Sequence, residues 1–557
     1  MGNQRVLLYI TLFFIIYLIW AKWQVTYEPK PLAANPAASS QTLKQQGTAQ
    51  SPQSDKTTSV GIIPQAVAVK EKQITPAVTE NKIPATYIHV KTDLIDAKID
   101  TRGGDIKQLV LLHYLEKAND KSKKVHLLST SANQFQVVQS GLVSAQKGFS
   151  PSHNAIYKAE KLNYQLANGQ NEIKVPLYWQ NNQGLKVKKV LIFKRDSYVV
   201  NVNYYVTASN EKWTGSDYMQ IAHIPPTAHK NKFDRSYKGG VLYNDKIKYE
   251  KHKFKDMAEK NIKENLNNGW LAIIDHYFIT AWIPQKAKNN LYYSRYLAKK
   301  DEYILGVRSP ALSVQPGKTL VIKNRLVVSP KLQYELEKIE PGLDLTVDYG
   351  ILTIIAKPLF WLLNFFHTIT GNWGWAIILL TISVKLAFYK LSEMSYRSMA
   401  RMRLVAPRIK QLKERFGDDR QAMSKAMMGM YKKEKINPMG GCLPILVQMP
   451  VFLALYWVLL GSVEMRHAPF IFWITNLTGK DPYYILPILM GISMFIQQKL
   501  NPAPVDPIQQ KIFQVMPFAF SFMFAFFPSG LVLYWVVNNI LSISQQYVIT
   551  RRIENAK

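Results

Sequence analysis

Long apolar runs without charged residues stand at the start of the chain and in its last third, and a more polar region separates them. Such runs are typical of membrane-spanning helices, whereas the short apolar and polar alternations between them are typical of half-buried strands. A length of 557 residues indicates roughly two to four domains. We therefore predict a multi-span α-helical membrane protein that also carries a large β-sandwich domain.

The first apolar run, Val6–Trp20, is preceded by Arg5 and followed by Lys22 and Trp23. A cleaved signal peptide is the alternative interpretation, but no small-x-small cleavage site follows. Aromatic and basic flanks are typical of a membrane interface. Residues 1–23 are predicted to be an uncleaved transmembrane anchor with a cytoplasmic N-terminus.

The next two segments differ sharply in composition. Residues 24–86 are rich in Pro, Ala, Ser, Gln and Thr and show no periodicity, which predicts a flexible linker because little apolar surface can be buried. Residues 87–340 contain short alternations, such as Tyr198–Tyr205, punctuated by turn signals such as Asn168-Gly169. We predict an antiparallel β-sandwich there.

Residues 341–370 contain an apolar run interrupted by Lys357-Pro358, with an aromatic face that includes Trp361 and Phe365. This pattern favours an amphipathic helix lying at the membrane interface. Five further runs follow, and with the anchor they predict six transmembrane helices. They cover about 373–391, 443–463, 483–498, 512–527 and 530–549.

The loop between the second and third spans, about 395–436, is strongly basic. The positive-inside rule places it in the cytoplasm, together with the short tail 553–557. The β domain then lies in the periplasm. Basic residues of the loop include Arg397, Arg401, Arg403, Arg408, Lys410, Lys413, Arg415, Arg420, Lys425, Lys432, Lys433 and Lys435.

The formal net charge is +32, which fits anionic phospholipids, an acidic protein or nucleic acid. No nucleic-acid-binding motif is present, so DNA is not expected as a partner, and ribosomal RNA would be met only through a docked ribosome. Cys442 is the single cysteine, which excludes an intrachain disulfide and a cysteine-built metal site. We expect neither a metal nor a cofactor.

Lys385 lies near the middle of the predicted second span, and no Asp or Glu occurs in the five C-terminal spans. A cation at bilayer depth costs about 3 kcal/mol, so it should face a polar cavity, a partner charge or the interface. Snorkelling to the cytoplasmic surface is the alternative. We predict a water-filled site.

Polar residues of other spans fall on common helix faces and can line the same site. Interhelical hydrogen bonding is an equally simple role for each of them singly. Together with an unpaired lysine, they favour a hydrophilic substrate groove. The predicted groove residues are Thr381, Lys385, Gln448, Ser493, Gln497, Tyr534, Asn538, Ser542 and Gln545.

Two of the spans, 483–498 and 512–527, are short. Roughly 16 residues make about 24 Å of helix, against a hydrocarbon core of about 30 Å. Short helices are expected to thin the bilayer locally. A thinned membrane beside a positive groove lowers the barrier to moving a polar segment across.

The basic loop is predicted to be a helical hairpin that turns at Phe416-Gly417, with Asp418 or Asp419 as the N-cap of its second helix. Its methionines, including Met423 and Met427, can form an adaptable surface for apolar substrates. The basic side chains Arg401, Arg403 and Arg408 would meet acidic partners. A plain hairpin core with a solvated basic face is equally plausible.

Several stretches closely resemble the YidC family of membrane protein insertases from Gram-negative bacteria. They are GNWG at 371–374, NPMGGC at 437–442, QMPVF at 448–452, DPYYILP at 481–487 and FPSGL at 527–531. The resemblance is most specific over residues 371–552.

The resemblance implies a five-helix insertase core, a groove closed outward, and a periplasmic domain similar to a galactose-mutarotase-like supersandwich. It also implies action without a cofactor on nascent membrane proteins, alone or with the Sec translocon, with ribosome and signal-recognition components as further partners. The family's groove charge is usually arginine, and Lys385 occupies the matching position. Lysine keeps the charge but loses bidentate geometry.

Two other functions remain open at this stage. A sugar-modifying enzyme would need an assignable acid and base, and none emerges from the histidine spacing. A small-molecule transporter would be expected to contain inverted repeats with broken helices, which the sequence does not show. An insertase that is not an enzyme is the favoured interpretation.

Overall fold

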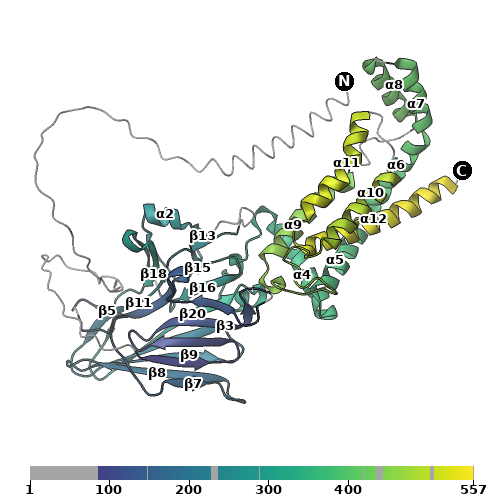
Figure 1. The fold of residues 1–557 in the computed structure, drawn as a ribbon. Helices are drawn as coiled ribbons and strands as arrows, with labels where there is room; N and C mark the ends of the chain where they lie inside the picture. Colours follow the sequence, from purple (N-terminus) through teal and green to yellow (C-terminus); the bar gives the residue numbers. More distant parts are fainter. Residues whose placement is uncertain are drawn as a thin grey trace, which may run out of the picture.

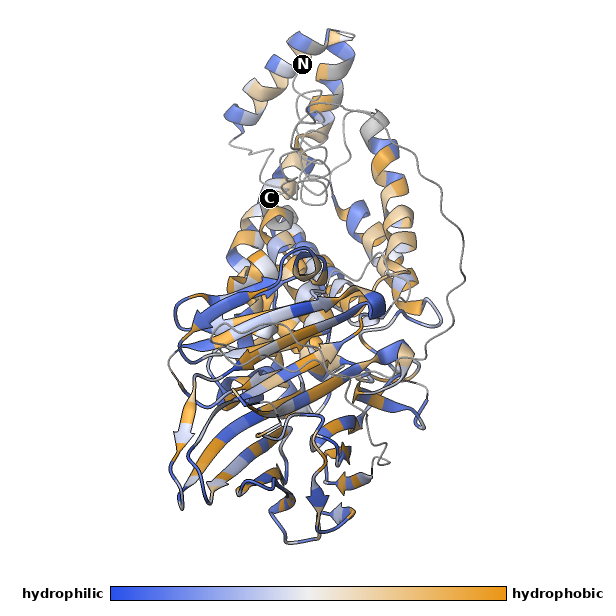
Figure 2. Cartoon of the chain, turned by 90° about the vertical axis from the view of Figure 1, so that its left-hand side faces the viewer, coloured by the Kyte–Doolittle hydropathy of each residue, from blue (hydrophilic) through white to orange (hydrophobic). Residues whose placement is uncertain are grey.

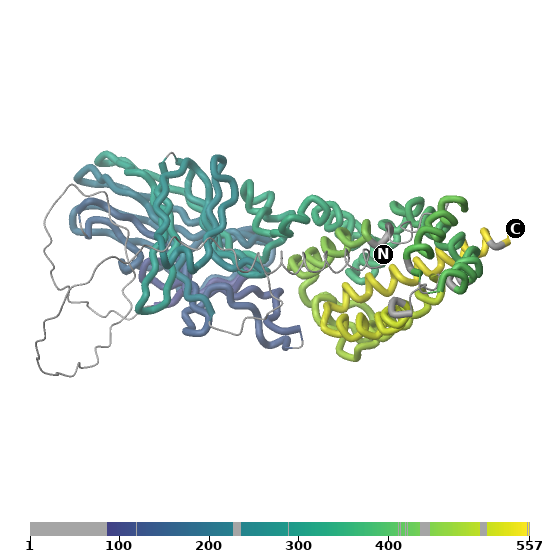
Figure 3. Tube along the Cα trace, turned by 90° about the horizontal axis from the view of Figure 1, so that it is seen from above, coloured from purple at the N-terminus to yellow at the C-terminus, as the bar shows by residue number. Residues whose placement is uncertain are grey.

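The computed structural model describes residues 86–118, 120–146, 148–226, 236–287, 289–417, 419–434, 443–501 and 507–555. The predicted anchor 1–23, the linker up to residue 85, Asp418 and Cys442 lie outside the described residues. A β-rich body is followed along the chain by a helical body (Figure 1). The two occupy opposite ends of the molecule when it is seen from above (Figure 3).

The β-rich body contains three sheets. The first, in the order β4-β3-β2-β1-β7, consists of β1 (Tyr87–Lys91), β2 (Ile95–Asp100), β3 (Asp105–Leu115), β4 (Lys124–Leu128) and β7 (Asn163–Gln165). The second, in the order β13-β12-β15-β16-β20-β10-β9-β8-β6, consists of β6 (Lys158–Ala159), β8 (Glu172–Gln180), β9 (Leu185–Lys194), β10 (Val199–Ala208), β12 (Gly239–Asn244), β13 (Lys248–His252), β15 (Trp270–Ile274), β16 (Phe278–Ile283) and β20 (Thr319–Pro330).

The third sheet follows the order β14-β17-β18-β11-β19, and β5 also pairs with β11. Its strands are β5 (Gln136–Ser144), β11 (Trp213–His223), β14 (Lys263–Leu266), β17 (Asn290–Leu297), β18 (Glu302–Arg308) and β19 (Leu312–Val314). Two features differ from the predicted all-β antiparallel domain. The pair β1 and β7 is parallel, and two short helices are present: α2 (Phe254–Glu259) lies between β13 and β14, and α3 (Gln333–Ile339) follows β20.

Alternation of buried and exposed residues explains the packing of these sheets. In β10, Val200, Val202, Tyr204 and Val206 are buried, while Thr207 is more exposed. Successive side chains of a strand point to opposite faces, so one face of β10 enters the core. Figure 2 shows the same banding of apolar and polar residues along the strands.

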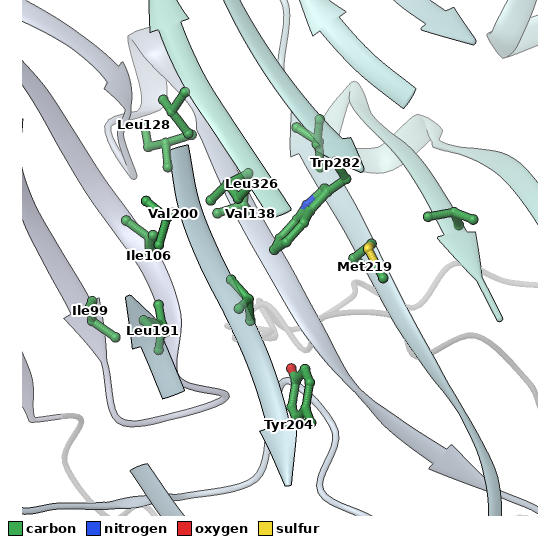
Figure 4. Packing of buried hydrophobic residues seen from close by; sticks show 14 of the residues in the cluster. Ile99, Ile106, Leu128, Val138, Leu191, Val200, Tyr204, Met219, Trp282 and Leu326 are labelled. Carbon is green, nitrogen blue, oxygen red and sulfur yellow. The ribbon is translucent and has the colours of Figure 1, made fainter. Parts of the chain in front are cut away.

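All three sheets contribute to one hydrophobic core (Figure 4). Ile106 comes from the first sheet, Leu191 and Trp282 from the second, and Val138 from the third. These side chains are almost fully buried. The β-rich domain predicted from the sequence is therefore present, with a core built between sheets.

The helical body contains nine helices within the described residues. They are α4 (Thr353–Thr370), α5 (Trp373–Ala387), α6 (Tyr389–Leu404), α7 (Ala406–Phe416), α8 (Arg420–Lys433), α9 (Leu443–Gly461), α10 (Ile485–Leu500), α11 (Pro507–Phe524) and α12 (Ser529–Asn555). Helix α12 packs against α5, α6, α9 and α10, and α4 packs against α5 and α9. Short 3-10 turns occupy Ala132–Gln134, Ala298–Lys300, Leu343–Thr346, Gly350–Leu352 and Val463–Met465.

The segment predicted as one span over 373–391 is divided in the structure. Asn372 caps α5, and its Oδ1 accepts hydrogen bonds from the backbone N–H groups of Gly374 (2.8 Å) and Trp375 (3.3 Å). Helix α5 ends at Ala387, and α6 continues at an angle of 67°. The bend lies between the apolar helix α5 and the more polar helix α6.

Among the described residues, one helical stretch, Gly350–Thr370, is long and apolar enough to cross a membrane, and the bent pair α5 and α6 would be a second. Leu446–Gly461 and Ile485–Leu500 are apolar but shorter. The count of six spans therefore stays a prediction. Gly350–Thr370 is the segment predicted to lie at the interface, and it buries Phe360 and Leu363 while Trp361 and Phe365 are exposed.

The two bodies meet at the end of α9. Nε2 of His276 lies 2.8 Å from the carbonyl oxygen of Leu460, and the Arg466 guanidinium lies over the ring of Phe278, 5.4 Å from its centroid. Glu464 accepts a 3.3 Å hydrogen bond from the backbone N–H of Gln333. Burial raises the pKa of Glu464 to about 7. The junction thus includes a desolvated carboxyl group.

Candidate functional site

Lys385 lies in the last turn of α5, close to the bend, and not at the middle of a longer helix as the sequence predicted. Its side chain is buried, with 7% of the residue exposed. The ammonium Nζ donates a 2.7 Å hydrogen bond to Oγ of Ser542 on α12. Among the described residues, no acidic side chain forms an ion pair with it. The positive charge is therefore held by a neutral hydroxyl.

Ser542 is fixed by its own helix. Its Oγ donates to the carbonyl oxygen of Asn538, at 2.7 Å, so the lone pairs of that oxygen remain for Lys385. Thr381 lies one turn before Lys385 and is buried, with its hydroxyl bonded to the carbonyl of Ile377 at 2.7 Å. Four predicted groove residues, Thr381, Lys385, Asn538 and Ser542, are thus gathered where α5 meets α12.

The other side of α12 forms a second polar contact, with α10. Nδ2 of Asn539 donates to Oγ of Ser493 at 3.0 Å. Nε2 of Gln546 donates to the carbonyl of Leu500 and to Oδ1 of Asn501, both at 3.0 Å. The predicted residue Ser493 therefore bonds to α12 and is not hydrogen-bonded to Lys385.

Asn539 and Gln546 were missed by the sequence reasoning, which followed residues 534, 538, 542 and 545. The buried polar face of α12 instead includes 539, 542 and 546, spaced by three and four residues. This spacing is the helical signal that would have found them. Gln545 bonds to the carbonyl of Tyr389 at 3.2 Å, and Gln497 is half-buried.

Gln448 and Tyr534 bring α9 into the same region. The amide nitrogen of Gln448 is buried and has no hydrogen-bond partner among the described residues. Tyr534 is buried, and its ring stacks on Phe452 of α9 with centroids 6.4 Å apart. An unsatisfied buried amide costs free energy, so Gln448 is suited to bind a polar group that enters from elsewhere.

Two serines on α6 were also missed. Ser392 and Ser395 are buried, and their hydroxyl groups have no hydrogen-bond partner among the described residues. Helix α6 packs against α9 and α12, so these hydroxyls extend the polar region beyond the bend. The predicted second span ends at residue 391 and the predicted hairpin begins at residue 395, so the sequence prediction leaves both serines outside the groove.

The basic segment forms a pair of helices, α7 and α8, at the end of the molecule remote from the β-rich body (Figure 1). Asp419 caps α8 by accepting from the N–H groups of Gln421 (3.1 Å) and Ala422 (3.0 Å). Met427 packs against Val405 and Ile409 within the pair. That methionine therefore belongs to the hairpin core.

The remaining hairpin residues differ in their contacts. Arg408 pairs with Glu434 at 2.6 Å, and Arg403 donates to the carbonyl of Lys499 at 2.8 Å. Arg401 is exposed and Met423 is half-buried. Two other methionines of the predicted adaptable surface, Met394 on α6 and Met428 on α8, are exposed.

Chemically, the site can hold charge and form hydrogen bonds. Within the described residues, no group of His, Cys, Asp and Glu side chains has the arrangement of a metal site. The Lys385 ammonium has three donors and uses one on Ser542. Its remaining donors suit carboxylate or carbonyl oxygens, which are the polar groups of a polypeptide.

Comparison with known proteins gives matches along most of the chain. A family described as the YidC periplasmic domain matches residues 87–362, and one described as the 60Kd inner membrane protein matches residues 365–556. A membrane protein insertase YidC from Thioalkalivibrio sulfidiphilus (strain HL-EbGR7) is 48% identical over 566 residues, covering 100% of this chain and 99% of that protein.

A second protein of that name, from Methylococcus capsulatus (strain ATCC 33009 / NCIMB 11132 / Bath), is 46% identical and covers 100% of this chain and 99% of its own. Among solved structures, an active YidC insertase with its first transmembrane domain resolved aligns with a TM-score of 0.39 and 17% identity. That alignment covers 84% of this chain and 93% of the other.

Proposed function

Because this chain belongs to the YidC family of membrane protein insertases of the bacterial inner membrane, we propose that it inserts nascent membrane proteins through a hydrophilic groove centred on Lys385. The observation that carries the proposal is a buried ammonium whose hydrogen-bond partner is the neutral Ser542 hydroxyl. As an insertase, the protein is not an enzyme, and the sugar-modifying alternative is set aside.

In the proposed mechanism, Lys385 attracts acidic side chains or carbonyl groups of an incoming polypeptide. An ion pair in a low-dielectric site is far stronger than one in water. Gln448, Ser392 and Ser395 then offer hydrogen bonds to the polar segment, because their side-chain groups lack partners among the described residues. The apolar helix of the substrate leaves sideways into lipid.

The proposed topology has six spans, with both termini and the α7–α8 hairpin in the cytoplasm and the β-rich body in the periplasm. Support comes from the β-rich body and the α7–α8 hairpin, which lie at opposite ends of the helical core (Figure 1). It also comes from the basic residues of the hairpin, which should remain on the cytoplasmic side. The β-rich body is proposed to be a galactose-mutarotase-like supersandwich.

The proposed partners follow from the surfaces. The exposed side chains of Met394 on α6 and Met428 on α8 can contact apolar nascent segments. Basic side chains such as Arg401 can contact anionic phospholipids or the ribosome. We also propose that the protein acts alone or with the Sec translocon, as a chaperone for inner-membrane proteins, and that signal-recognition components deliver some substrates.

Site-specific photocrosslinking tests the route. A photoreactive residue at Gln448 or Tyr534 should crosslink to a small membrane protein during its synthesis, because both positions lie by the proposed groove. Phe522 on α11 is 72% exposed and provides a control position facing outward. Crosslinks from Phe522 but none from Gln448 or Tyr534 would contradict passage through the groove.

A further inference from the structure

The end of the helical body nearest the β-rich body is closed by the loop between α9 and α10. We call residues 468–484 the β-side cap. The cap is tied to α5, because Nδ2 of Asn372 donates to the carbonyl of Phe470 at 3.3 Å. It is tied to α12, because the N–H of Gly530 donates to the carbonyl of Leu477 at 2.9 Å. The cap therefore bridges the starts of two core helices.

A buried carboxylate fixes the cap internally. Asp481 is 2% exposed and accepts hydrogen bonds from Nε1 of Trp473 at 3.0 Å and from the backbone N–H of Leu486 at 2.7 Å. The second bond anchors the cap to the first turn of α10. Trp473 and Leu486 are thereby held to one side chain, so the cap has a defined shape.

The tip of this rigid cap is apolar and exposed. Phe472 is 86% exposed, and Ile471 is exposed beside it. The backbone of Phe472 has a φ of 51°, in the left-handed region that disfavours a residue with a bulky side chain. Glycine or asparagine would relieve that strain in a loop surrounded by water. Phenylalanine instead occupies this strained position, and its ring points outward.

Further exposed apolar side chains follow at the end of the cap and on the next helix. Tyr483 and Tyr484 are exposed at the end of the cap, and Ile488 and Ile492 are exposed on α10. Nearby, Nζ of Lys480 lies 5.0 Å from the ring centroid of Phe526. Tyrosine, tryptophan and lysine at the end of an apolar surface are typical of the zone where lipid headgroups meet water.

We propose that the β-side cap is a membrane-seated wedge, with Ile471 and Phe472 buried among the lipid acyl chains of the adjacent leaflet and Tyr483 and Tyr484 at headgroup level. The partner of this surface is lipid, and the substrate groove has no part in it. Because α10 has 16 residues, a helix of roughly 24 Å, a cap seated in the leaflet helps a short helix to match a thicker bilayer.

The test places a probe at the tip. In a Cys442→Ser background, which removes the single cysteine, Phe472→Cys carries a polarity-sensitive fluorophore in the full-length protein. The protein is reconstituted in vesicles of phosphatidylethanolamine and phosphatidylglycerol. Quenching is measured with nitroxide on the lipid acyl chain and with aqueous iodide. Ile471→Cys serves as a second probe if the Phe472 variant does not fold.

Two matched positions calibrate the result. Phe522→Cys on α11 reports a lipid-facing site, and Leu162→Cys, 46% exposed on the β-rich body, reports a water-facing site. We expect the tip probe to behave like Phe522, with several-fold stronger quenching by lipid nitroxide than the Leu162 probe. Iodide quenching equal to that at Leu162 would overturn the proposal. Protection that appears only after a purified translocon is added would also overturn it, in favour of a protein partner.

Discussion

At the scale of single residues, the Lys385 ammonium depends on one hydroxyl for its position. Ser542 accepts the bond from Lys385 while its own proton is used on the carbonyl of Asn538. A hydrogen bond of this kind between transmembrane helices is worth about 1 kcal/mol. Losing it should misplace the charge without removing it.

We therefore expect Ser542→Ala to lower the insertion rate of an acidic-tailed substrate by about two- to tenfold, less than removal of the lysine itself. Ser544→Ala is the matched control, because the Ser544 hydroxyl bonds within α12 to the carbonyl of Ile540 and is exposed. Insertion into vesicles at equal protein level measures the effect. Equal activity of the two variants would show that Ser542 does not position Lys385.

At residue level, helical spacing predicts which positions share one face of a helix, but it does not separate two faces that adjoin. The sequence predicts that Lys385 and Ser542 lie in one polar site, and in the structure a hydrogen bond joins them. The sequence pattern indicates Gln545, whereas Gln546 is the more buried of the two, because adjacent positions on a helix differ in direction by about 100°. For Met427 the sequence leaves a binding surface and the hairpin core equally plausible, and the structure packs it against the hairpin core. Apolar residues of a short hairpin fill its core first.

At the scale of elements, the hairpin α7–α8 is a separate unit beyond the bend. Helix α6 shares a buried surface with α12, whereas α7 and α8 pack mainly on each other. Deletion of 406–433 with a short linker should abolish insertion while leaving the core helices assembled, because it removes the proposed capture surface. Protease protection measures whether the core helices remain assembled, and an insertion assay measures the loss of insertion. Normal insertion by this variant would refute a capture role.

The junction between the bodies should respond to pH through Glu464. Burial, the largest cause, and the nearby carboxyl of Glu335 together raise its pKa to about 7. The folded state therefore keeps a proton that the unfolded chain releases near its ordinary value of 4.5. The protonated carboxyl of Glu464 makes its full contribution to the free energy of unfolding below that value. The contribution falls as pH rises toward 7, by about 1.4 kcal/mol per pH unit at most.

Glu464→Gln removes the titrating group while keeping a polar side chain of similar size. We expect the thermal unfolding midpoint of the purified parent protein to decrease as the pH is raised from 5 to 8. In the variant, most of this decrease should be absent. Glu116→Gln, at a residue whose backbone carbonyl accepts a 3.2 Å hydrogen bond from Arg466, is a control at the same junction. The same pH dependence in parent and Glu464→Gln would rule Glu464 out as its source.

Helix caps and turns could be predicted from the sequence, but the bend between α5 and α6 could not. The N-cap at Asp419 and the turn at Gly417 followed from local residue chemistry. The division of α5 from α6 did not, because residues around Phe388 remain compatible with a continuing helix. Only packing against α12 and the contact of Gln545 with the Tyr389 carbonyl mark the bend.

At the scale of the whole molecule, the β-rich body and the helical core have separate hydrophobic cores joined at a small junction. Deletion of residues 87–320, with the helix after residue 350 retained, should leave insertion at near parental levels. It should also lower thermal stability, because the contacts of Leu460 and Arg466 are lost. Absence of insertion by a truncated protein that remains in the membrane would contradict this expectation.

The most direct test of the groove mechanism is insertion of an acidic-tailed membrane protein by variants of Lys385 at equal expression. Lys385→Arg should remain near the parent, since the charge is kept. Lys385→Ala and Lys385→Glu should fall by about tenfold or more, the effect of losing roughly 1.4 kcal/mol of attraction. Neutralising the acidic residues of the substrate should restore Lys385→Ala toward the parent. If Lys385→Ala inserts the acidic-tailed substrate as fast as the parent, the charge has no part in insertion and the groove mechanism is wrong.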